Sequence, residues 1–478
     1  MRYTGLPRQR TRIVCTIGPA TNTAAMIGQL IKAGMDVARL NLSHGSLDQH
    51  ASCVEMVRKL SAALSRPVAV LMDIPGPKYR TGYMRQKSIS LVKGAEITLT
   101  TRQIEGDDNV VPVNIATLPK DARVGSRILV DDGAIQLKVI AVDKTEVKCR
   151  VIVGGQLTAG RGVVLPGVRT SAPFVTDRLK QMVDFAADQA PDYIAVSFVN
   201  CPEDVVQIRE ILSRRKVKIP LIAKIEKELA VKKFDSILAV SDAVMVARGD
   251  LGVDIPLEKV PLVQKDIIGK CNRAGKPVIT ATQMLESMIS AARPTRAEVT
   301  DVANAIFDGT DAIMLSAETS VGKYPVQAVR MMGQIARETE KKLPYEDMLI
   351  KRSAWIVPQT DELLAYDACH NADKLGAAAI VAFTESGSTA QRVSKYRPRT
   401  PIIAITSNRS VRGKLQLFWG VQAFQVDTSS SVNDLFGTAS RLVKEMKLAR
   451  SGQLIVITGG IPLGVAGTTN LLKVERVP

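Results

Sequence analysis

The sequence predicts a closed (β/α)8 TIM barrel that carries an inserted all-β domain and is followed by an open α/β domain. Continuous apolar runs alternate with amphipathic helical segments up to about Pro344. Between Gly82 and Leu165 the helical pattern stops, and alternating apolar and polar residues replace it. Beyond Pro344 a second series of runs and helices begins. A length of 478 residues agrees with about three domains.

Eight apolar runs rich in β-branched residues predict the barrel strands. Continuous runs are typical of parallel strands that are buried on both faces. The runs are Ile13–Ile17, Val37–Leu42, Val68–Met72, Tyr193–Phe198, Leu221–Ile225, Ala243–Val246, Val278–Thr282 and Ile313–Ser316. Helical patterns follow them, and Ser46 with Gln49 and Thr295 with Glu298 predict capping boxes. Eight such repeats favour a closed barrel.

Alternating stretches predict a small all-β domain after the third strand. They are Ile89–Leu91, Ile97–Leu99, Ile128–Val130, Leu137–Val142 and Val147–Val153, with turns at Asp107–Asn109 and Asp131–Gly133. An insertion at the carboxyl end of a barrel strand can act as a lid. The expected domains are the barrel at 1–82 and 167–345, the lid at 83–166 and the α/β domain at 346–478. Strands of the last domain are expected at Ala378–Phe383, Ile402–Ile405, Val421–Val426 and Leu454–Ile457.

The chain has a large positive charge, because 64 Lys and Arg residues exceed 47 Asp and Glu residues and give +17. Such a surplus favours anionic partners. The basic residues are dispersed and form no arginine-rich arm, so we expect small phosphorylated substrates and no nucleic acid.

Several features predict a cytoplasmic protein without a membrane segment. No apolar run approaches the roughly 20 residues that span a bilayer. Met1–Arg12 is basic and lacks the apolar core of a secretory signal. The six cysteines form no CxxC pair and suit a reducing compartment.

Polar residues gather after the predicted strands, at the end of the barrel where active sites lie. They are Arg39, Asn41, Ser43, His44, Asp73, Lys78, Arg80, Lys224, Glu226, Arg248, Gly249, Asp250, Thr280, Thr282, Ser316 and Glu318. Any one of them could be a solvated strand terminus, but their convergence favours a functional site.

Glu226 and Asp250 end neighbouring strands and suit Mg²⁺, which takes one or two carboxylates and completes its shell with water and substrate oxygens. The alternative is an ion pair with Lys224 or Arg248. Lys224 lies two residues before Glu226, so both side chains point to one face of the strand. A lysine there can neutralise charge on a transferred phosphoryl group, and Arg39 is suited to bind phosphate.

Around these residues the sequence resembles the pyruvate kinases, over nearly the whole chain. The matching segments are Thr16–Pro19, Ala38–Gly45, Ala223–Glu226, Met245–Gly252, Lys270–Ser287, Pro294–Glu298 and Asp301–Leu315. The resemblance implies the glycolytic transfer of a phosphoryl group from phosphoenolpyruvate to ADP, which yields pyruvate and ATP. It also implies Mg²⁺, with Mn²⁺ as the other candidate ion, and a homotetramer.

The resemblance assigns roles to individual residues. Arg39, Lys224 and Thr282 are the implied catalytic residues, and Thr282 would position a proton relay rather than act as the acid itself. Glu226 and Asp250 would hold the metal. Substrate contacts would come from Arg39, Ala247, Arg248, Gly249, Asp250 and Thr282, and nucleotide contacts from Asn41, His44 and Arg80.

One departure from the family concerns a monovalent cation. The family commonly reads DTKGPEIRTG where this chain has Asp73–Gly82, so its glutamate is replaced by Lys78. In the common form, the residues at Asn41, Ser43, Asp73 and Ile74 would bind K⁺. Like charges a few ångströms apart repel by about one to a few kcal/mol. We therefore expect Lys78 to replace K⁺; the rival is that it points into solvent.

The C-terminal domain contains a candidate effector loop. Thr384, Ser386, Gly387, Ser388 and Thr389 follow a predicted strand and open a helix, an arrangement that can bind an anion. The loop resembles the family's effector phosphate site, beside Gly459–Pro462 and Gly464–Asn470. A phosphorylated activator is therefore expected, against the alternative of an ordinary helix cap.

Two other functions are compatible with part of the sequence. A lyase or aldolase that handles phosphoenolpyruvate would share the metal carboxylates but would need neither a lid nor a nucleotide site. A regulatory paralogue without activity, or one that binds RNA, would not require Lys224, Glu226, Asp250 and Thr282, all of which are present.

Overall fold

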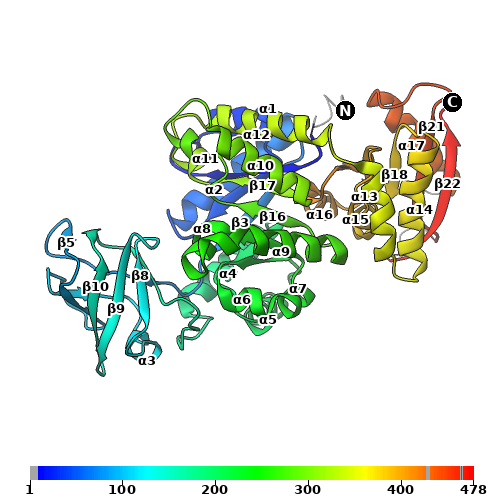
Figure 1. Cartoon of the computed structure of the whole chain (residues 1–478). Helices are drawn as coiled ribbons and strands as arrows, with labels where there is room; N and C mark the ends of the chain where they lie inside the picture. The colour runs from blue at the N-terminus through cyan, green and yellow to red at the C-terminus, as the bar shows by residue number, and fades with distance from the viewer. Residues whose placement is uncertain (1–8, 427–430, 463–464, 466) are drawn as a thin grey trace.

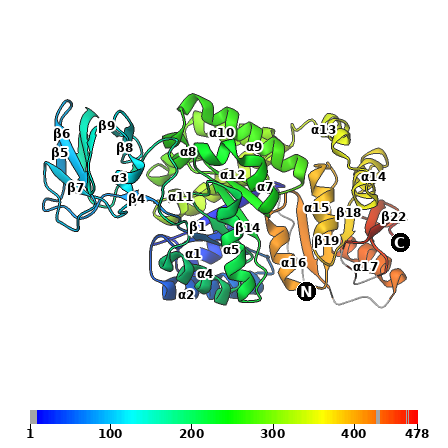
Figure 2. The same cartoon turned by 90° about the horizontal axis from the view of Figure 1, so that it is seen from below.

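The computed structural model describes residues 9–426, 431–462, 465 and 467–478. The segments Met1–Arg12 and Gly464–Asn470 considered above therefore lie partly outside the described residues. Figures 1 and 2 show a central barrel with the β domain on one side and the C-terminal domain on the opposite side. Among the helices that the structure describes, none is both long and apolar enough to cross a membrane.

In the described part of the chain, the eight predicted runs form parallel strands of one closed barrel. They are β1 (Arg12–Ile17), β2 (Val37–Asn41), β3 (Ala69–Ile74), β13 (Tyr193–Val196), β14 (Leu221–Ile225), β15 (Ala243–Ala247), β16 (Val278–Ala281) and β17 (Ala312–Leu315). Each pairs with the next in this order, and β17 returns to pair with β1. The predicted barrel is confirmed.

Helices surround the barrel, as the repeats predicted. They are α1 (Ala24–Ala33), α2 (Leu47–Ala63), α4 (Asp177–Gln189), α5 (Pro202–Arg214), α6 (Glu228–Lys232), α7 (Phe234–Val240), α8 (Arg248–Asp254), α9 (Val260–Ala274), α10 (Arg296–Asp308), α11 (Ala317–Ser320) and α12 (Pro325–Glu340). Both predicted capping boxes are present: Ser46 and Gln49 start α2, and Thr295 and Glu298 start α10. These side chains satisfy N–H groups that a helix start leaves without partners.

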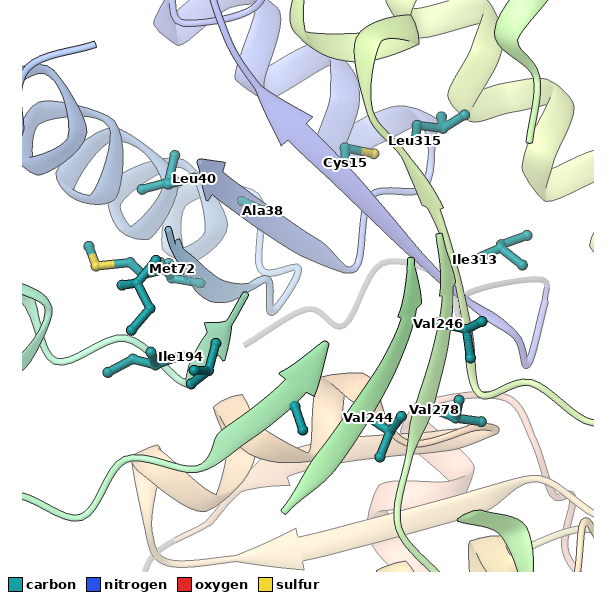
Figure 3. Packing of buried hydrophobic residues seen from close by; sticks show 14 of the residues in the cluster. Cys15, Ala38, Leu40, Met72, Ile194, Val244, Val246, Val278, Ile313 and Leu315 are labelled. Atoms are coloured by element: carbon teal, nitrogen blue, oxygen red, sulfur yellow. The ribbon is translucent and has the colours of Figure 1, made fainter. Parts of the chain in front are cut away.

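Strand alternation sorts the barrel residues into two cores. One set faces the surrounding helices, and Figure 3 labels its members Cys15, Ala38, Leu40, Met72, Ile194, Val244, Val246, Val278, Ile313 and Leu315. The other set fills the inside of the barrel and includes Val37, Leu71 and Ile222. Counting on from Ile222 in steps of two places Lys224 and Glu226 inward as well. Lys224 and Glu226 therefore belong to the last layer of the barrel interior.

The insertion is a β domain between β3 and α4. Its elements are β4 (Tyr79–Arg80), β5 (Ile89–Leu91), β6 (Glu96–Thr100), β7 (Val110–Pro112), α3 (Leu118–Asp121), β8 (Arg127–Val130), β9 (Ile135–Val142), β10 (Glu146–Val153), β11 (Gly155–Leu157) and β12 (Gly162–Val164). The main sheet has the order β4–β12–β8–β9–β10–β6–β7. At the predicted turn, Asp131, Asp132 and Gly133 take positive φ values of 52°, 51° and 90°.

The C-terminal domain is an open sheet covered by helices. Its elements are α13 (Tyr345–Arg352), α14 (Thr360–Lys374), β18 (Ile380–Phe383), α15 (Ser388–Lys395), β19 (Ile402–Thr406), α16 (Arg409–Lys414), β20 (Val421–Gln425), α17 (Val432–Glu445), β21 (Leu454–Gly460) and β22 (Thr469–Arg476). The sheet order is β20–β19–β18–β21–β22, and β22 is an antiparallel edge strand that the sequence reading missed.

The two outer domains meet opposite ends of the barrel strands. At the amino end, Asp311 precedes β17 and pairs with Arg397 of the C-terminal domain at 2.8 Å. Tyr193, at the start of β13, donates its hydroxyl to the carbonyl of Lys414 at 2.8 Å. The β domain leaves the barrel at the carboxyl end of β3, which is the end that carries the polar layer.

Candidate active site

Lys224 is the centre of the polar layer at the carboxyl end of the barrel. Its Nζ lies 2.7 Å from Ser197 Oγ, 3.0 Å from Glu226 Oε1 and 3.3 Å from Asp73 Oδ1. Only 8% of Lys224 is exposed. Three neighbouring strands, β3, β13 and β14, supply these groups or lead directly into them, so the barrel walls fix the position of the ammonium group.

The charges around Lys224 keep it protonated. Burial alone would lower the pKa of Lys224, but the carboxylates of Asp73 and Glu226 outweigh burial and raise it. Burial would raise the pKa of Asp73, but Lys224 and Arg39 outweigh it, and the pKa is lowered. The result is a fixed positive charge in a site with little water, where electrostatic interactions are strong.

Arg39 lies beside this lysine at the end of β2. Its Nε and Nη2 contact Asp73 Oδ2 at 2.8 and 2.7 Å, and its Nη1 donates to Thr16 Oγ1 at 2.8 Å. Thr16 in turn donates to the carbonyl of Leu315 at 2.9 Å. These contacts use three of the five N–H groups of a guanidinium, so two others are not used by them.

The two predicted metal ligands, Glu226 and Asp250, differ in burial. Glu226 is 1% exposed and accepts a 2.6 Å hydrogen bond from the N–H of Phe198. The Asp250 side chain, in the first turn of α8, is 31% exposed. Burial raises the pKa of Glu226, Lys224 opposes this, and the charge of Asp250 raises it further. The two carboxylates therefore repel each other, which is the electrostatic setting that a cation would relieve.

Both carboxylates form an ion pair, but only Glu226 does so with an expected partner. Lys224 contacts Glu226, whereas Arg248 pairs with Asp301 at 2.7 Å and Asp250 pairs with Lys78 instead. In the part of the chain that the structure describes, no group of three or more His, Cys, Asp and Glu side chains could hold a metal ion by itself. A metal at Glu226 and Asp250 would therefore need further ligands from water or substrate.

Thr282 follows β16 in a strained conformation. It has a φ of 67° and Gln283 has a φ of 53°, values that are rare for residues with a β-carbon. Arg248 stabilises this segment, because its Nη2 donates to the carbonyls of Thr282 and Gln283 at 2.7 and 3.0 Å. The hydroxyl of Thr282 accepts a 2.8 Å hydrogen bond from the N–H of Gly249.

Because of these contacts, the side chain of Arg248 holds the Thr282 segment and does not point to a substrate. Its guanidinium is buried against the Thr282 segment, and the residue is only 8% exposed. Ala247 ends β15, and Arg248, Gly249 and Asp250 form the start of α8. What Ala247, Arg248 and Gly249 can offer a ligand is therefore their backbone.

The three nucleotide candidates lie at the rim of the barrel. Asn41 ends β2, and its side-chain oxygen accepts a hydrogen bond from the N–H of Ser43 at 3.2 Å. His44 is exposed, and its carbonyl accepts from His50 Nε2 at 2.7 Å. Arg80 is exposed on β4 and donates to the carbonyl of Gly160 at 2.9 Å. All three side chains lie on segments that begin at the carboxyl ends of β2 and β3.

Lys78 connects the β domain to the barrel. Its Nζ lies 2.5 Å from Asp250 Oδ1 and 5.2 Å from the centre of the Phe198 ring, and its side chain is 16% exposed. The rival orientation, with Lys78 in solvent, is therefore not the one in this structure. The carbonyl of Ile74, at the end of β3, accepts a 3.3 Å hydrogen bond from the N–H of Ser197.

Ser197 is a site residue that the sequence reading missed. It follows β13, donates to Asp73 Oδ1 at 3.1 Å and contacts Lys224 Nζ at 2.7 Å. Its position at the end of the predicted run Tyr193–Phe198 was a signal of the same kind that identified the other candidates.

The candidate effector loop lines a pocket in the C-terminal domain. Thr384, Ser386, Ser388 and Thr389 are among its lining residues, together with Thr468 and Thr469 from the chain before and within β22. Gly387 lies at the start of α15 with a φ of 94° and donates its N–H to Thr384 Oγ1 at 2.9 Å. Thr389 and Thr469 share a 2.7 Å hydrogen bond between their hydroxyls. The pocket is thus lined by hydroxyl groups from several segments far apart in sequence, together with Glu385.

The barrel, with a buried lysine, an arginine and two carboxylates at its mouth, defines a (β/α)8-barrel enzyme of the phosphotransferase class. A family model described as "Pyruvate kinase, barrel domain" matches residues 8–329, and one described as "Pyruvate kinase, alpha/beta domain" matches residues 362–475. The chain belongs to the pyruvate kinase family.

Individual relatives agree with this assignment. Pyruvate kinases of Staphylococcus aureus strains MRSA252 and USA300 are each 45% identical over 471 residues, which is 98% of this chain and 80% of theirs. A crystal structure of a pyruvate kinase from Cryptosporidium parvum is 36% identical, with a TM-score of 0.94 over 98% of this chain and 97% of that one.

Proposed function

We propose that the protein transfers the phosphoryl group of phosphoenolpyruvate to ADP and releases pyruvate and ATP, as a step of glycolysis. The observation that carries the proposal is the buried Lys224, held at 3.0 Å from Glu226 and 3.3 Å from Asp73 with a raised pKa. Charge spreads over the equatorial oxygens of a phosphoryl group in transfer, and a fixed cation stabilises it. Lys224 supplies that cation and also stabilises the enolate left behind.

Glu226 and Asp250 would hold Mg²⁺, or Mn²⁺ in its place. The residues fit such an ion, because both are oxygen ligands and the charge of Asp250 raises the pKa of Glu226. When bound, the ion would neutralise part of the charge on the phosphoryl group in transfer. Arg39 binds the phosphate with the N–H groups that Asp73 and Thr16 do not use.

Substrate orientation and proton delivery fall to the Thr282 segment. The backbone at Ala247, Arg248 and Gly249 seats the carboxylate of the substrate, with Asp250 close by. Thr282 positions a water that delivers a proton to the enolate carbon, because a hydroxyl alone is a poor acid at neutral pH. Its orientation is supported by the N–H of Gly249 at 2.8 Å.

The nucleotide phosphates bind between the barrel and the β domain, at Asn41, His44 and Arg80. Lys78 takes the place of K⁺ in the region of Asn41, Ser43, Asp73 and Ile74, so the reaction requires no monovalent cation. The support for this is that Lys78 brings a permanent positive charge into the active site, although the contact that the structure gives it is to Asp250 at 2.5 Å and not to the residues of that region.

A phosphorylated metabolite binds the pocket at Thr384, Ser386, Gly387, Ser388 and Thr389 and activates the enzyme. The hydroxyl groups around this pocket and the start of α15 suit a phosphate. We further propose a homotetramer in the cytoplasm. The six cysteines are all free and buried, which suits a reducing compartment.

A coupled assay of pyruvate formation tests the main proposal. Wild-type protein is expected to turn over phosphoenolpyruvate only when ADP and Mg²⁺ are both present, and EDTA is expected to abolish the reaction. Glu226→Gln should lose activity, whereas Glu228→Gln should keep it, because Glu228 pairs with Lys232 within α6 and not with Lys224. No turnover by the wild type with Mg²⁺ present would overturn the proposal.

A further inference from the structure

Asp121 lies where the two chain segments that connect the β domain to the barrel come together. The chain enters the domain at β4 and leaves it after β12, and Asp121 ends the short helix α3 between them. Its carboxylate accepts hydrogen bonds from the hydroxyls of Tyr79, Thr117 and Thr170 and from both the N–H and the hydroxyl of Ser171. Tyr79 belongs to the entering segment and Ser171 to the leaving one, so Asp121 joins them.

The contacts at Asp121 are suited to holding this junction closed. The N–H of Ser171 lies 3.0 Å from Oδ2, and the hydroxyls of Thr117 and Thr170 lie 3.0 and 3.3 Å from the same oxygen. Hydrogen bonds to a carboxylate are stronger than those between neutral groups. Although burial opposes it, these donors lower the pKa of Asp121, so the carboxylate stays charged at neutral pH.

Tyr79 transmits this restraint to the active site. It is 7% exposed, and its neighbours along the chain are Lys78, which contacts Asp250, and Arg80, a nucleotide candidate. Arg80 follows Tyr79 within β4, so their side chains point to opposite faces, and Lys78 directly precedes the strand. Fixing Tyr79 therefore fixes the backbone from which both neighbouring side chains extend. Asn114 adds a second restraint, because it contacts the carbonyl of Lys78 and the N–H of Arg80.

We propose that Asp121 is a positioning residue for phosphoryl transfer, which acts through Tyr79 to hold Lys78 against Asp250 and Arg80 at the nucleotide. The inference rests on the proposed function of Lys78 and Arg80. The hydrogen bonds of Asp121 go to Tyr79, Thr117, Thr170 and Ser171, none of which is a proposed substrate or metal ligand. Its loss should therefore weaken nucleotide binding through Arg80 and spare the binding of the phosphoenolpyruvate carboxylate, because the backbone of residues 247–249 belongs to the barrel.

The test measures kcat and KM for each substrate in Asp121→Asn and in a matched control. Asp107→Asn is the control, because Asp107 also accepts backbone hydrogen bonds in the β domain, but from Asn109 and Val110 of its own turn and not from a connecting segment. We expect Asp121→Asn to lower kcat/KM for ADP about tenfold, with KM for phosphoenolpyruvate unchanged. Asp107→Asn should match the wild type.

A double-mutant cycle with Arg80→Gln separates positioning from general damage. If Asp121 acts on the nucleotide through Arg80, Asp121→Asn should lower kcat/KM for ADP less than about twofold in the Arg80→Gln background. An equal loss in both backgrounds, or a loss of kcat with both KM values unchanged, would overturn the inference. Wild-type protein without activity would instead contradict the proposed function.

Tyr79→Phe keeps the test decisive if Asp121→Asn does not fold. It removes one hydroxyl from a residue whose ring packs in the β-domain core. The same change in KM for ADP is expected, at about threefold. Kinetics equal to the wild type in Tyr79→Phe would then count against the inference.

Discussion

Lys78 and Asp250 form an ion pair at 2.5 Å between residues 172 positions apart in the chain. Lys78 lies at the entrance to the β domain, and Asp250 lies in the first turn of α8 on the barrel. The pair puts a charged group of the inserted domain directly against one of the proposed metal ligands. The β domain therefore contributes to the electrostatics of the site.

The cation requirement is the first consequence that can be measured. Wild-type activity should be the same in buffers with and without K⁺ at equal ionic strength. Lys78→Glu should lose about tenfold or more of its activity without K⁺ and regain it when KCl is added, because the positive charge is then supplied by the ion. Lys93→Glu, on the exposed surface of the same domain, is the control and should stay independent of K⁺. A wild-type protein that needs K⁺ for most of its activity would contradict the proposal that Lys78 replaces the ion.

Thr282 is predicted to affect proton delivery more than binding. Thr282→Val should lower kcat about a hundredfold, because the water that protonates the enolate loses its anchor. KM for phosphoenolpyruvate should change little. Exchange of the methyl protons of pyruvate in heavy water, followed by NMR, should be lost in Thr282→Val and retained in Thr282→Ser. Normal exchange in the valine variant would remove Thr282 from the relay.

Ser197 is predicted to orient Lys224. Ser197→Ala removes the 2.7 Å contact to Nζ and the 3.1 Å hydrogen bond to Asp73, so kcat should fall about tenfold. Ser197→Thr keeps the hydroxyl and should recover most of the activity. Both variants are assayed for pyruvate formation at saturating substrates. A Ser197→Ala activity equal to that of the wild type would show that the hydroxyl has no role.

The proposal that the C-terminal pocket binds a phosphorylated activator can be tested by adding a negative charge there. Ser388→Glu places a carboxylate at the start of α15, where it should repel a phosphate and abolish activation by a panel of sugar phosphates and nucleotide monophosphates. Ser431→Glu puts the same charge at the start of α17 in the same domain and should leave activation intact. Activation that persists in Ser388→Glu would place the effector elsewhere.

Glu298 gives a prediction for stability against pH. Burial opposes it, but hydrogen bonds from Ser287 and Thr295 outweigh burial and lower the pKa of Glu298 below its ordinary 4.5. A lowered pKa in the folded state stabilises the protein above pH 4.5, and this stabilisation is lost as the pH falls through the folded-state value. Glu298→Gln should therefore cost about 1 kcal/mol in unfolding free energy near pH 7. Urea unfolding should show this difference shrinking toward pH 4; a constant difference would contradict it.

Local sequence patterns predicted most of the fold. The barrel strands were visible because parallel strands are apolar on both faces, and runs such as Val37–Leu42 contain few interruptions. The capping box at Ser46 was visible because both of its members lie within one turn. The edge strand β22 was missed because one side of it is solvated and its residues, from Thr469 to Arg476, include few consecutive apolar positions.

The candidate site was harder to predict, because its contacts join distant parts of the chain. Strand ends identified Lys224 and Glu226, and barrel topology explains why they meet Asp73. The orientation of the Lys78 side chain depends on how the β domain meets the barrel, and a local sequence pattern cannot predict that arrangement. Likewise, the burial of Arg248 against Thr282 depends on a strained loop whose φ values cannot be read from residue types alone.

Gly162 carries a consequence for exchanging domains between relatives. A β-carbon at this position of β12 would lie 2.8 Å from Cε of Lys78, closer than packed carbon atoms approach. Lys78 thus packs over Gly162, a residue without a side chain, in the strand β12 that pairs with β4. A chimaera that grafts Lys78 into a relative with a larger residue at the position of Gly162 would shift the end of the lysine side chain that contacts Asp250. Transplanting the two positions together avoids that shift.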